Sequence, residues 1–197
     1  MPQNSQSSAE SIAVANDLVD RLIGLVDEGV TTPILLIDGR AGSGKSTLAD
    51  LVQRGYFKLG DSLPRVVHMD DLYEGWDGLE AGVDYLNRFV LAPLKRREGA
   101  SWQEWDWAAN ERAGQWREFR GGTPLIVEGC GSLNGLSGEV ADIRVWLEVP
   151  EQVRHERWIA REGNDDFFGR WAAQEVEFYA REKSAELADL VVADQAD

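Results

Sequence analysis

The sequence predicts an α/β fold: a mostly parallel five-stranded sheet with helices on both faces. Five short apolar runs support this prediction, at residues 34–38, 65–69, 124–128, 143–148 and 190–192. A continuous apolar run of this length is typical of a strand that is buried on both faces, as in a parallel sheet. Strands that alternate with helical segments favour parallel pairing, and 197 residues are the size of one ordinary domain.

Helical spacing of apolar residues occupies most of the intervals between these runs. The predicted helices span residues 11–29, 46–54, 82–98, 151–162 and 167–188. We interpret residues 1–10, which are rich in Gln, Asn and Ser, as a disordered tail, and residues 11–197 as a single domain. The first helix is expected to cover the sheet, and a role in a homodimer is the alternative.

Tryptophan is concentrated in one segment that has little strand character. Residues 101–119 contain four of the 8 tryptophans of the chain: Trp102, Trp105, Trp107 and Trp116. We predict that this segment forms a helical or irregular aromatic flap outside the sheet. Packing against the core is the simplest role for any one of these side chains, and contact with a ligand is the alternative.

Charge and composition disfavour several classes of protein. The chain has 20 Lys+Arg and 35 Asp+Glu, so its formal net charge is −15. We expect no binding to nucleic acid or to membrane surfaces, because their phosphate groups would be repelled. No stretch approaches the ~18 apolar residues that span a bilayer, and the polar start does not resemble a secretory signal. Cys130 is the single cysteine, so no intrachain disulfide can form, and we expect a cytoplasmic protein.

The first apolar run is followed by the segment GRAGSGKST, which matches the pattern G-x-x-x-x-G-K-[ST]. Glycines in this pattern let backbone N–H groups approach phosphate oxygens, and the helix that follows adds the positive end of its dipole. Lys45 is expected to bridge the β- and γ-phosphates, and Ser46 to offer a hydroxyl to Mg²⁺. The motif therefore predicts the P-loop NTPase fold with ATP and Mg²⁺ as cofactors, and a chance match in a glycine-rich turn is the alternative. The predicted nucleotide-binding residues are Gly39, Ala41, Gly42, Ser43, Gly44, Lys45, Ser46 and Thr47.

Three further features narrow the class of P-loop protein. The Asn-Lys-x-Asp motif of GTPases is absent from the sequence. The run at 124–128 ends in Glu128 and a glycine, whereas a motor ATPase would usually show Asp or Asp-Glu at this point. The run at 65–69 continues into DDLY (residues 70–73), which places carboxylates at the end of a strand, where open α/β sheets bind ligands.

Together, the segments GRAGSGKST, DDLY and EG resemble the uridine kinase-like group of nucleoside and metabolite kinases, and the resemblance covers about residues 33–192. It implies that Asp70 accepts the proton of the attacking hydroxyl group and that Tyr73 lines the acceptor pocket. It also implies that Glu128 helps to hold Mg²⁺, often through water. From the residues alone, the alternatives are a cap of a helix or turn for Asp70 and a solvated acid for Glu128.

The segment WDWAANER (residues 105–112) resembles the part of these kinases that shapes the nucleoside pocket, roughly Tyr-Asp-Phe-x-x-His-x-Arg. Asn110 stands where the family often has a histidine that contacts the base. An Asn side chain has both a donor and an acceptor, so it is compatible with a nucleoside, a sugar, an amine or another polar metabolite. The predicted substrate-binding residues are Asp70, Tyr73, Trp76, Trp105, Asp106, Asn110 and Arg112.

The predicted helix over 151–162 carries Arg154, Arg157 and Arg161, whose spacings of three and four place them on one face. It resembles the lid helix with which these kinases cover the γ-phosphate, and guanidinium groups bind phosphoryl oxygens bidentately. A surface helix with ion pairs is the alternative. The predicted catalytic residues are Asp70, Lys45, Arg157 and Arg161, and the predicted metal-binding residues are Ser46 and Glu128.

The sequence thus predicts an ATP-dependent kinase that phosphorylates a hydroxyl group of a small polar acceptor. The resemblance makes a nucleoside the first candidate acceptor. A sugar or a pantothenate-like alcohol is the close alternative. A P-loop ATP-binding or ATPase module without kinase activity is the alternative from a different functional class.

Overall fold

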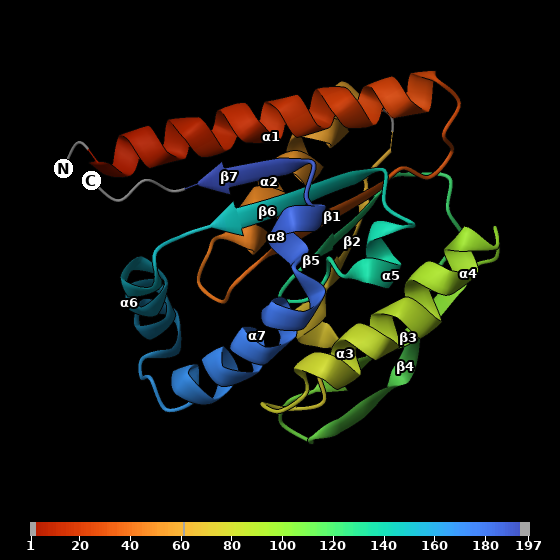
Figure 1. The fold of residues 1–197 in the computed structure, drawn as a ribbon. Helices are drawn as coiled ribbons and strands as arrows, with labels where there is room; N and C mark the ends of the chain where they lie inside the picture. Colours follow the sequence, from red (N-terminus) through yellow and green to blue (C-terminus); the bar gives the residue numbers. More distant parts are fainter. Residues whose placement is uncertain (1–2, 61, 194–197) are drawn as a thin grey trace.

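The computed structural model describes residues 3–60 and 62–193. Five strands form one sheet in the order β2-β5-β1-β6-β7, and every pairing between them is parallel. The strands are β1 (Ile34–Gly39), β2 (Arg65–His68), β5 (Leu125–Glu128), β6 (Ile143–Glu148) and β7 (Leu190–Ala193) (Figure 1). The predicted α/β fold with a parallel five-stranded sheet is confirmed.

The central strand β1 is buried along its whole length, as its apolar run predicts. It pairs with β5 on one side and β6 on the other, so Ile37 lies opposite both Glu128 and Val145. On the far side of β5, His68 at the end of β2 pairs with Glu128. The carboxyl ends of these strands therefore meet at one edge of the sheet, beside the loop that follows β1.

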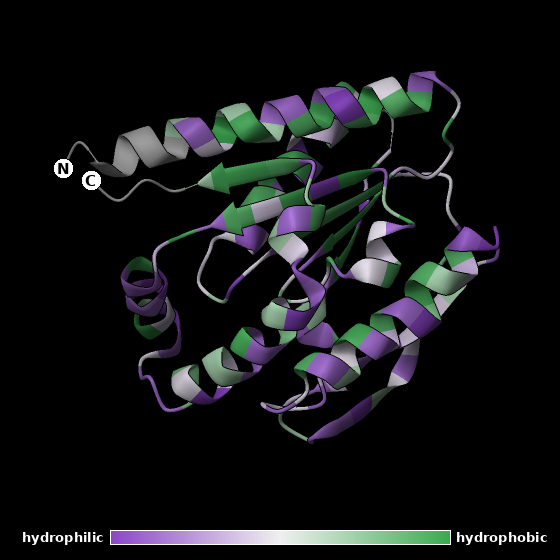
Figure 2. Cartoon of the chain, in the orientation of Figure 1, coloured by the Kyte–Doolittle hydropathy of each residue, from purple (hydrophilic) through white to green (hydrophobic). Residues whose placement is uncertain are grey.

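Helices cover both faces of the sheet (Figure 1). They include α1 (Gln3–Asp27), α2 (Lys45–Leu59), α3 (Leu79–Tyr85) and α7 (Phe168–Glu182). Leu18 and Leu22 of α1 share one core with Val52 of α2 and the sheet, and α3 and α7 contribute to the core on the other face. Most of the main sheet is coloured as hydrophobic in Figure 2, whereas α1 alternates between polar and apolar residues. Within residues 3–60 and 62–193, no helix has both the length and the apolar character needed to cross a membrane.

Four of the five predicted helices differ from the structure in their limits, and the one predicted over 46–54 extends as α2 to Leu59. We expected a tail over residues 1–10, but α1 begins at Gln3, and residues 1–2 lie outside the described residues. Extending an existing helix needs no new nucleation, so polar residues can continue it. The helix predicted over 82–98 is divided by a π-helical segment, and the one predicted over 167–188 is interrupted at Lys183, whose φ angle is 54°.

The remaining elements are η1 (Met69–Asp71), η2 (Leu86–Leu91), α4 (Ala92–Lys95), α5 (Gly135–Gly138), α6 (Glu151–Glu162) and α8 (Ser184–Leu187).

The tryptophan-rich segment is a β-hairpin, so the prediction of a helical or irregular flap was wrong. Strands β3 (Ala100–Asp106) and β4 (Glu111–Phe119) pair antiparallel and form a sheet of their own, separate from the main sheet as expected. Only the first part of β3 alternates between buried and half-buried residues, which explains why the pattern was not evident. Across the hairpin, Arg117 donates two hydrogen bonds of 2.8 Å to Glu104, a favourable cross-strand pair.

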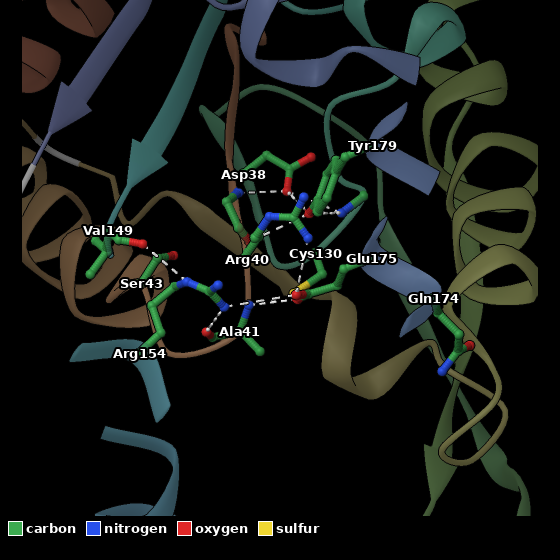
Figure 3. A network of polar contacts seen from close by, with 12 residues as sticks. Asp38, Arg40, Ala41, Ser43, Cys130, Val149, Arg154, Gln174, Glu175 and Tyr179 are labelled. Atoms are coloured by element: carbon green, nitrogen blue, oxygen red, sulfur yellow. Dashed lines mark hydrogen bonds and ion pairs between the residues drawn. The ribbon is translucent and has the colours of Figure 1, made fainter. Parts of the chain in front are cut away.

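Asp38, near the end of β1, is fully buried and accepts four hydrogen bonds (Figure 3). The donors are the backbone N–H groups of Gly39, Gly131 and Leu133, at 2.6–3.0 Å, and the hydroxyl of Tyr179, at 2.7 Å. Burial raises the pKa of Asp38 to about 6 in spite of these donors. The carboxyl group thus joins β1 to the loop after β5 and to helix α7.

Replacing Asp38 by Asn should destabilise the fold by about 1–3 kcal/mol, because an amide nitrogen cannot accept a hydrogen bond from a buried N–H group. Urea unfolding measures this change, with exposed Asp50→Asn as the control.

The pH dependence gives a second readout for Asp38→Asn. Because the folded-state pKa of about 6 lies above the ordinary value of 3.8, the folded protein binds this proton more tightly than the unfolded chain. The resulting stabilisation is present at low pH and is lost as the pH rises through about 6. The Asn variant lacks this term, so its stability deficit should shrink from about pH 5 to about pH 7. A deficit that does not change over this range would contradict the raised pKa.

Candidate functional site

The P-loop runs from the end of β1 to the start of α2, and three of its glycines have positive φ angles. The angles are 147° at Gly39, 80° at Gly42 and 95° at Gly44. A Cβ atom at Gly42 would lie 2.4 Å from the carbonyl oxygen of Arg154, and one at Gly39 would lie 2.6 Å from that of Leu147. These glycines therefore allow both an unusual backbone and the close approach of α6 to the loop.

Lys45, the first residue of α2, is buried against the loop that it follows. Its Nζ donates to the carbonyl oxygen of Arg40 at 3.1 Å and lies 3.6 Å from Sγ of Cys130. Burial alone would lower the pKa of Lys45, but the surrounding acidic groups, among them Cys130, Glu128 and Glu175, raise it above its ordinary value. Lys45 is therefore a charged group in a position to meet phosphate oxygens.

A buried ionic network holds the P-loop against α6 and α7 (Figure 3). Oε1 of Glu175 accepts a hydrogen bond of 2.6 Å from the backbone N–H of Ala41 and one of 3.2 Å from Cys130. Arg154 donates to the carbonyl oxygens of Val149, at 3.1 Å, and Ala41, at 3.2 Å. Arg154 is 5% exposed, so it holds the loop in place and does not face solvent as part of a lid.

Two cavities reach the P-loop from different sides. The N-terminal cavity, of about 380 Å³, is lined by residues 10–12 of α1, by Ser43 and Gly44 of the loop, by Thr47 of α2 and by Arg157. The tryptophan cavity, of about 450 Å³, is lined by the loop, by acidic residues and by aromatic side chains. Its lining residues are Ala41, Gly42, Lys45, Ser46, Asp70, Tyr73, Trp76, Trp107, Glu128, Cys130, Trp158, Arg161, Glu162 and Trp171.

Asp70 lies in η1, directly after β2, and its side chain faces the tryptophan cavity. Asp70 is exposed at the surface of the cavity, but the dense protein around it raises its pKa above the ordinary value, and the charge of Glu128 adds to this shift. Lys45 and Arg161 act in the opposite direction. A carboxyl group with a raised pKa beside a charged lysine is suited to accept a proton from a hydroxyl group.

Glu128 ends β5 and is almost completely buried. Its Oε1 lies 2.6 Å from Nδ1 of His68, and this hydrogen bond raises the pKa of His68 above its ordinary value. In the sequence, His68 stands inside an apolar run, which gives no sign of this contact. The pairing follows from the strand register, which places the two residues side by side.

The donor atoms of this cavity fit Mg²⁺, which prefers oxygen ligands and keeps phosphate and water oxygens in its shell. The Ser46 hydroxyl and the Glu128 carboxylate both line the cavity. In the part of the chain that the structure describes, no group of three or more His, Cys, Asp or Glu residues is arranged to hold a metal ion. A Mg²⁺ ion would therefore depend on phosphate oxygens as well as on the protein.

The predicted acceptor residues separate into two groups. Asp70, Tyr73 and Trp76 line the tryptophan cavity, although the Tyr73 hydroxyl donates to the carbonyl oxygen of Cys130 at 2.7 Å. The other four do not line it, and their role in acceptor binding stays a prediction. They are Trp105, Asp106, Asn110 and Arg112.

Asp106 and Arg112 have structural contacts in the hairpin. Asp106 accepts hydrogen bonds from the N–H groups of residues 108 and 109 and so stabilises the turn. Arg112 donates to the carbonyl oxygen of Leu72 at 2.9 Å, pairs with Glu74, and lies 3.8 Å from the ring centroid of Tyr85. These contacts join the hairpin to the loop after β2 and thereby place Trp107 at the cavity.

The three arginines of α6 contact different surroundings, although we expected them on one face. Arg154 is buried beside the P-loop, Arg157 lines the N-terminal cavity and Arg161 lines the tryptophan cavity. Trp158 and Trp171 also line the tryptophan cavity, and sequence analysis did not identify them. Trp171 belongs to the apolar face of α7, which looks the same whether it packs in the core or lines a cavity, and Trp158 stands among the charged residues of α6.

Comparison with known proteins supports the fold. A family model described as an AAA domain matches residues 35–167. The structure is similar to that of a possible uridine kinase from Bacillus stearothermophilus, with a TM-score of 0.63 and 20% identity, over 89% of this chain and 98% of that one. It is also similar to a proposed fructose transport system kinase from Silicibacter sp. TM1040, with a TM-score of 0.60 and 21% identity, over 90% of this chain and 98% of that one. No curated protein sequence matches the chain. The expected resemblance to uridine kinase-like P-loop kinases is confirmed in the fold.

The P-loop geometry predicts the effect of Gly42→Ala. The added methyl group would meet the backbone of Arg154, and the residue would have to keep a φ angle of 80°. We expect binding of a fluorescent ATP analogue to weaken at least about tenfold. Gly169→Ala is the control, because this helical glycine has open space around its Cβ position. Unchanged nucleotide binding in Gly42→Ala would contradict the proposed role of the loop.

Proposed function

Because this chain belongs to the AAA-domain family of P-loop proteins and has the fold of the P-loop kinases, we propose that it is an ATP-dependent kinase. In this proposal it transfers the γ-phosphoryl group of Mg·ATP to a hydroxyl group of a small polar acceptor. The observation that carries the proposal is the position of the P-loop between two cavities. An enzyme that joins two substrates needs one compartment for each, with the transferred group between them.

The N-terminal cavity is proposed to hold the adenosine part of ATP. It lies beside Ser43, Gly44 and Thr47, and its walls include apolar side chains such as Ile12 and Leu51. An apolar cavity with a few polar groups is typical of sites for a ring system. This assignment leaves the triphosphate to run along the P-loop toward Lys45 and Ser46.

The tryptophan cavity is proposed to hold the acceptor. Asp70 would orient the attacking hydroxyl and take its proton, while Lys45 and Arg161 stabilise the charge on the transferring phosphoryl group. A bound Mg²⁺ would neutralise phosphate oxygens, with Ser46 and Glu128 as the residues that hold it. The aromatic walls would limit the access of water and thus wasteful hydrolysis of ATP.

Asp70→Asn should lower acceptor-dependent release of ADP by about 10²–10⁴-fold, because the amide cannot accept the proton. Binding of a non-hydrolysable ATP analogue should be unchanged. A coupled ADP assay with nucleosides, sugars and hydroxylated amines as acceptors measures the first effect. Asp71→Asn is the matched control, since this neighbouring residue does not line the cavity. Hydrolysis that needs no acceptor and is equal in the wild type and Asp70→Asn would favour an ATPase module instead.

Arg157→Ala and Arg161→Ala should affect different steps, because the two arginines line different cavities. We expect Arg161→Ala to lower kcat by about 10²-fold or more through lost charge stabilisation. Arg157→Ala is expected to raise the KM for ATP by about fivefold to tenfold with a smaller change in kcat. Steady-state kinetics with varied ATP separates these outcomes. The same effect of both substitutions on kcat would argue against separate compartments.

A further inference from the structure

The tryptophan cavity has an unusual wall. Four of the 8 tryptophans of the chain line it, and each comes from a different segment. Trp76 precedes α3, Trp107 lies in the hairpin turn, Trp158 lies on α6 and Trp171 on α7. Convergence of four large aromatic side chains on one cavity concentrates the negative potential of their ring faces there.

The orientation of these rings does not suit a flat base. The ring plane of Trp76 makes angles of 55° with Trp107, 54° with Trp158 and 83° with Trp171, at centroid distances of 5.1, 5.8 and 6.5 Å. At these distances and angles the rings are in direct contact, so together they form an angled wall of the cavity and leave no slot between parallel faces for a planar base. Trp76 does have a parallel neighbour, Phe167, but at 4.5 Å the two rings stack on each other and leave no room for a base between them.

The charged groups of the cavity also limit the kind of ligand that it can bind. Its described lining includes the carboxyl groups of Asp70, Glu128 and Glu162. The cations in this lining are Lys45 and Arg161, and both are assigned to phosphate oxygens in the proposed reaction. Glu128 is assigned to Mg²⁺, and Glu162 pairs with Arg161 at 2.7 Å, so these assignments leave the Asp70 carboxyl group and the aromatic faces to the acceptor. Such surroundings attract a cation and repel an anionic acceptor.

We infer that the acceptor is a cationic alcohol: an amine or quaternary ammonium compound that carries a hydroxyl group. The inference rests on the proposed kinase function of the same cavity. The cationic group lies among the tryptophan rings, and the hydroxyl group lies near Asp70. In the reaction, the hydroxyl oxygen forms a bond to the γ-phosphorus, and the bond from this phosphorus to the β–γ bridging oxygen breaks. The proton moves to Asp70, and ADP leaves.

The first test compares acceptors that have the same shape but different charge. Choline and its neutral carbon isostere, 3,3-dimethylbutan-1-ol, form one pair, and glucosamine and glucose form another. ADP release gives kcat/KM for each compound, and calorimetry in the presence of a non-hydrolysable ATP analogue gives its binding affinity. We expect the cationic member of at least one pair to bind about tenfold more tightly and to react more efficiently.

The second test removes one wall of the cavity. Trp107 is 40% exposed, so Trp107→Leu should fold normally. The variant also removes the 2.9 Å hydrogen bond from Trp107 Nε1 to the carbonyl oxygen of Asp70, and the neutral isostere measures the effect of that loss. This variant should reduce the advantage of the cationic compound by about fivefold to thirtyfold and leave the KM for ATP unchanged. Trp116→Leu is the matched control, because Trp116 lies in the same hairpin, is 51% exposed and does not line the cavity.

The outcomes separate this inference from the proposed function. Tight binding of the cationic compound that depends on Trp107 but is not followed by ADP release would support a cation site among the four tryptophans and contradict the kinase proposal. Equal use of a cationic compound and its neutral isostere, or preference for uridine, would contradict the inference of a cationic acceptor and leave the kinase proposal intact. If no amine in the panel binds more tightly than its neutral counterpart, the inference is wrong.

Discussion

The shape of the P-loop depends on two buried carboxyl groups, Asp38 and Glu175. Asp38 accepts hydrogen bonds from the loop and from the segment after β5, and Glu175 accepts one from the N–H group of Ala41. Carboxylates hold backbone N–H groups strongly, and in low dielectric surroundings they need compensating charge. Oε2 of Glu175 has no hydrogen bond, but the guanidinium groups of Arg40 and Arg154 lie 3.8 and 3.9 Å away. The loop is therefore positioned by an ionic network that also holds the charge of Lys45.

This network also holds the N-terminal half of α6, which contains Arg154, against the P-loop. The carbonyl oxygen of Arg154 lies where a side chain on Gly42 would be, and the Arg154 guanidinium binds the loop. A lid that moved as one body would have to break these contacts. The C-terminal half of the helix instead packs through Trp158 against Trp76 and Phe168, and it ends at Gly163 with a φ angle of 76°. Any closure over the phosphates should therefore be confined to the residues after Arg154.

Sequence analysis predicted those parts of the site that are encoded in contiguous segments. The P-loop, the carboxylate after β2 and the glutamate at the end of β5 follow apolar strands in the sequence, and parallel strands bring their carboxyl ends together. The same reasoning could not place residues 105–112, because the position of a hairpin depends on contacts such as that of Arg112 with Leu72. Trp171 was missed for a related reason: helical periodicity shows that a face of α7 is apolar but does not show what it packs against. Trp158 was missed because it stands among the charged residues of α6.

The choice of acceptor depends on the part of the structure that is least evident from sequence. The P-loop and Asp70 are compatible with phosphorylation of many different alcohols, because in-line transfer requires only a positioned hydroxyl group and charge stabilisation. Specificity has to come from the remaining walls, which are aromatic side chains contributed by the loop before α3, the hairpin, α6 and α7. Rings inclined at 54–83° to Trp76 and in contact with it leave no slot between parallel faces for a base, and the Asp70 carboxyl group beside them disfavours an anion. In the proposed kinase, a P-loop fold that is compatible with many acceptors would be combined with an aromatic cavity that determines which acceptor is used.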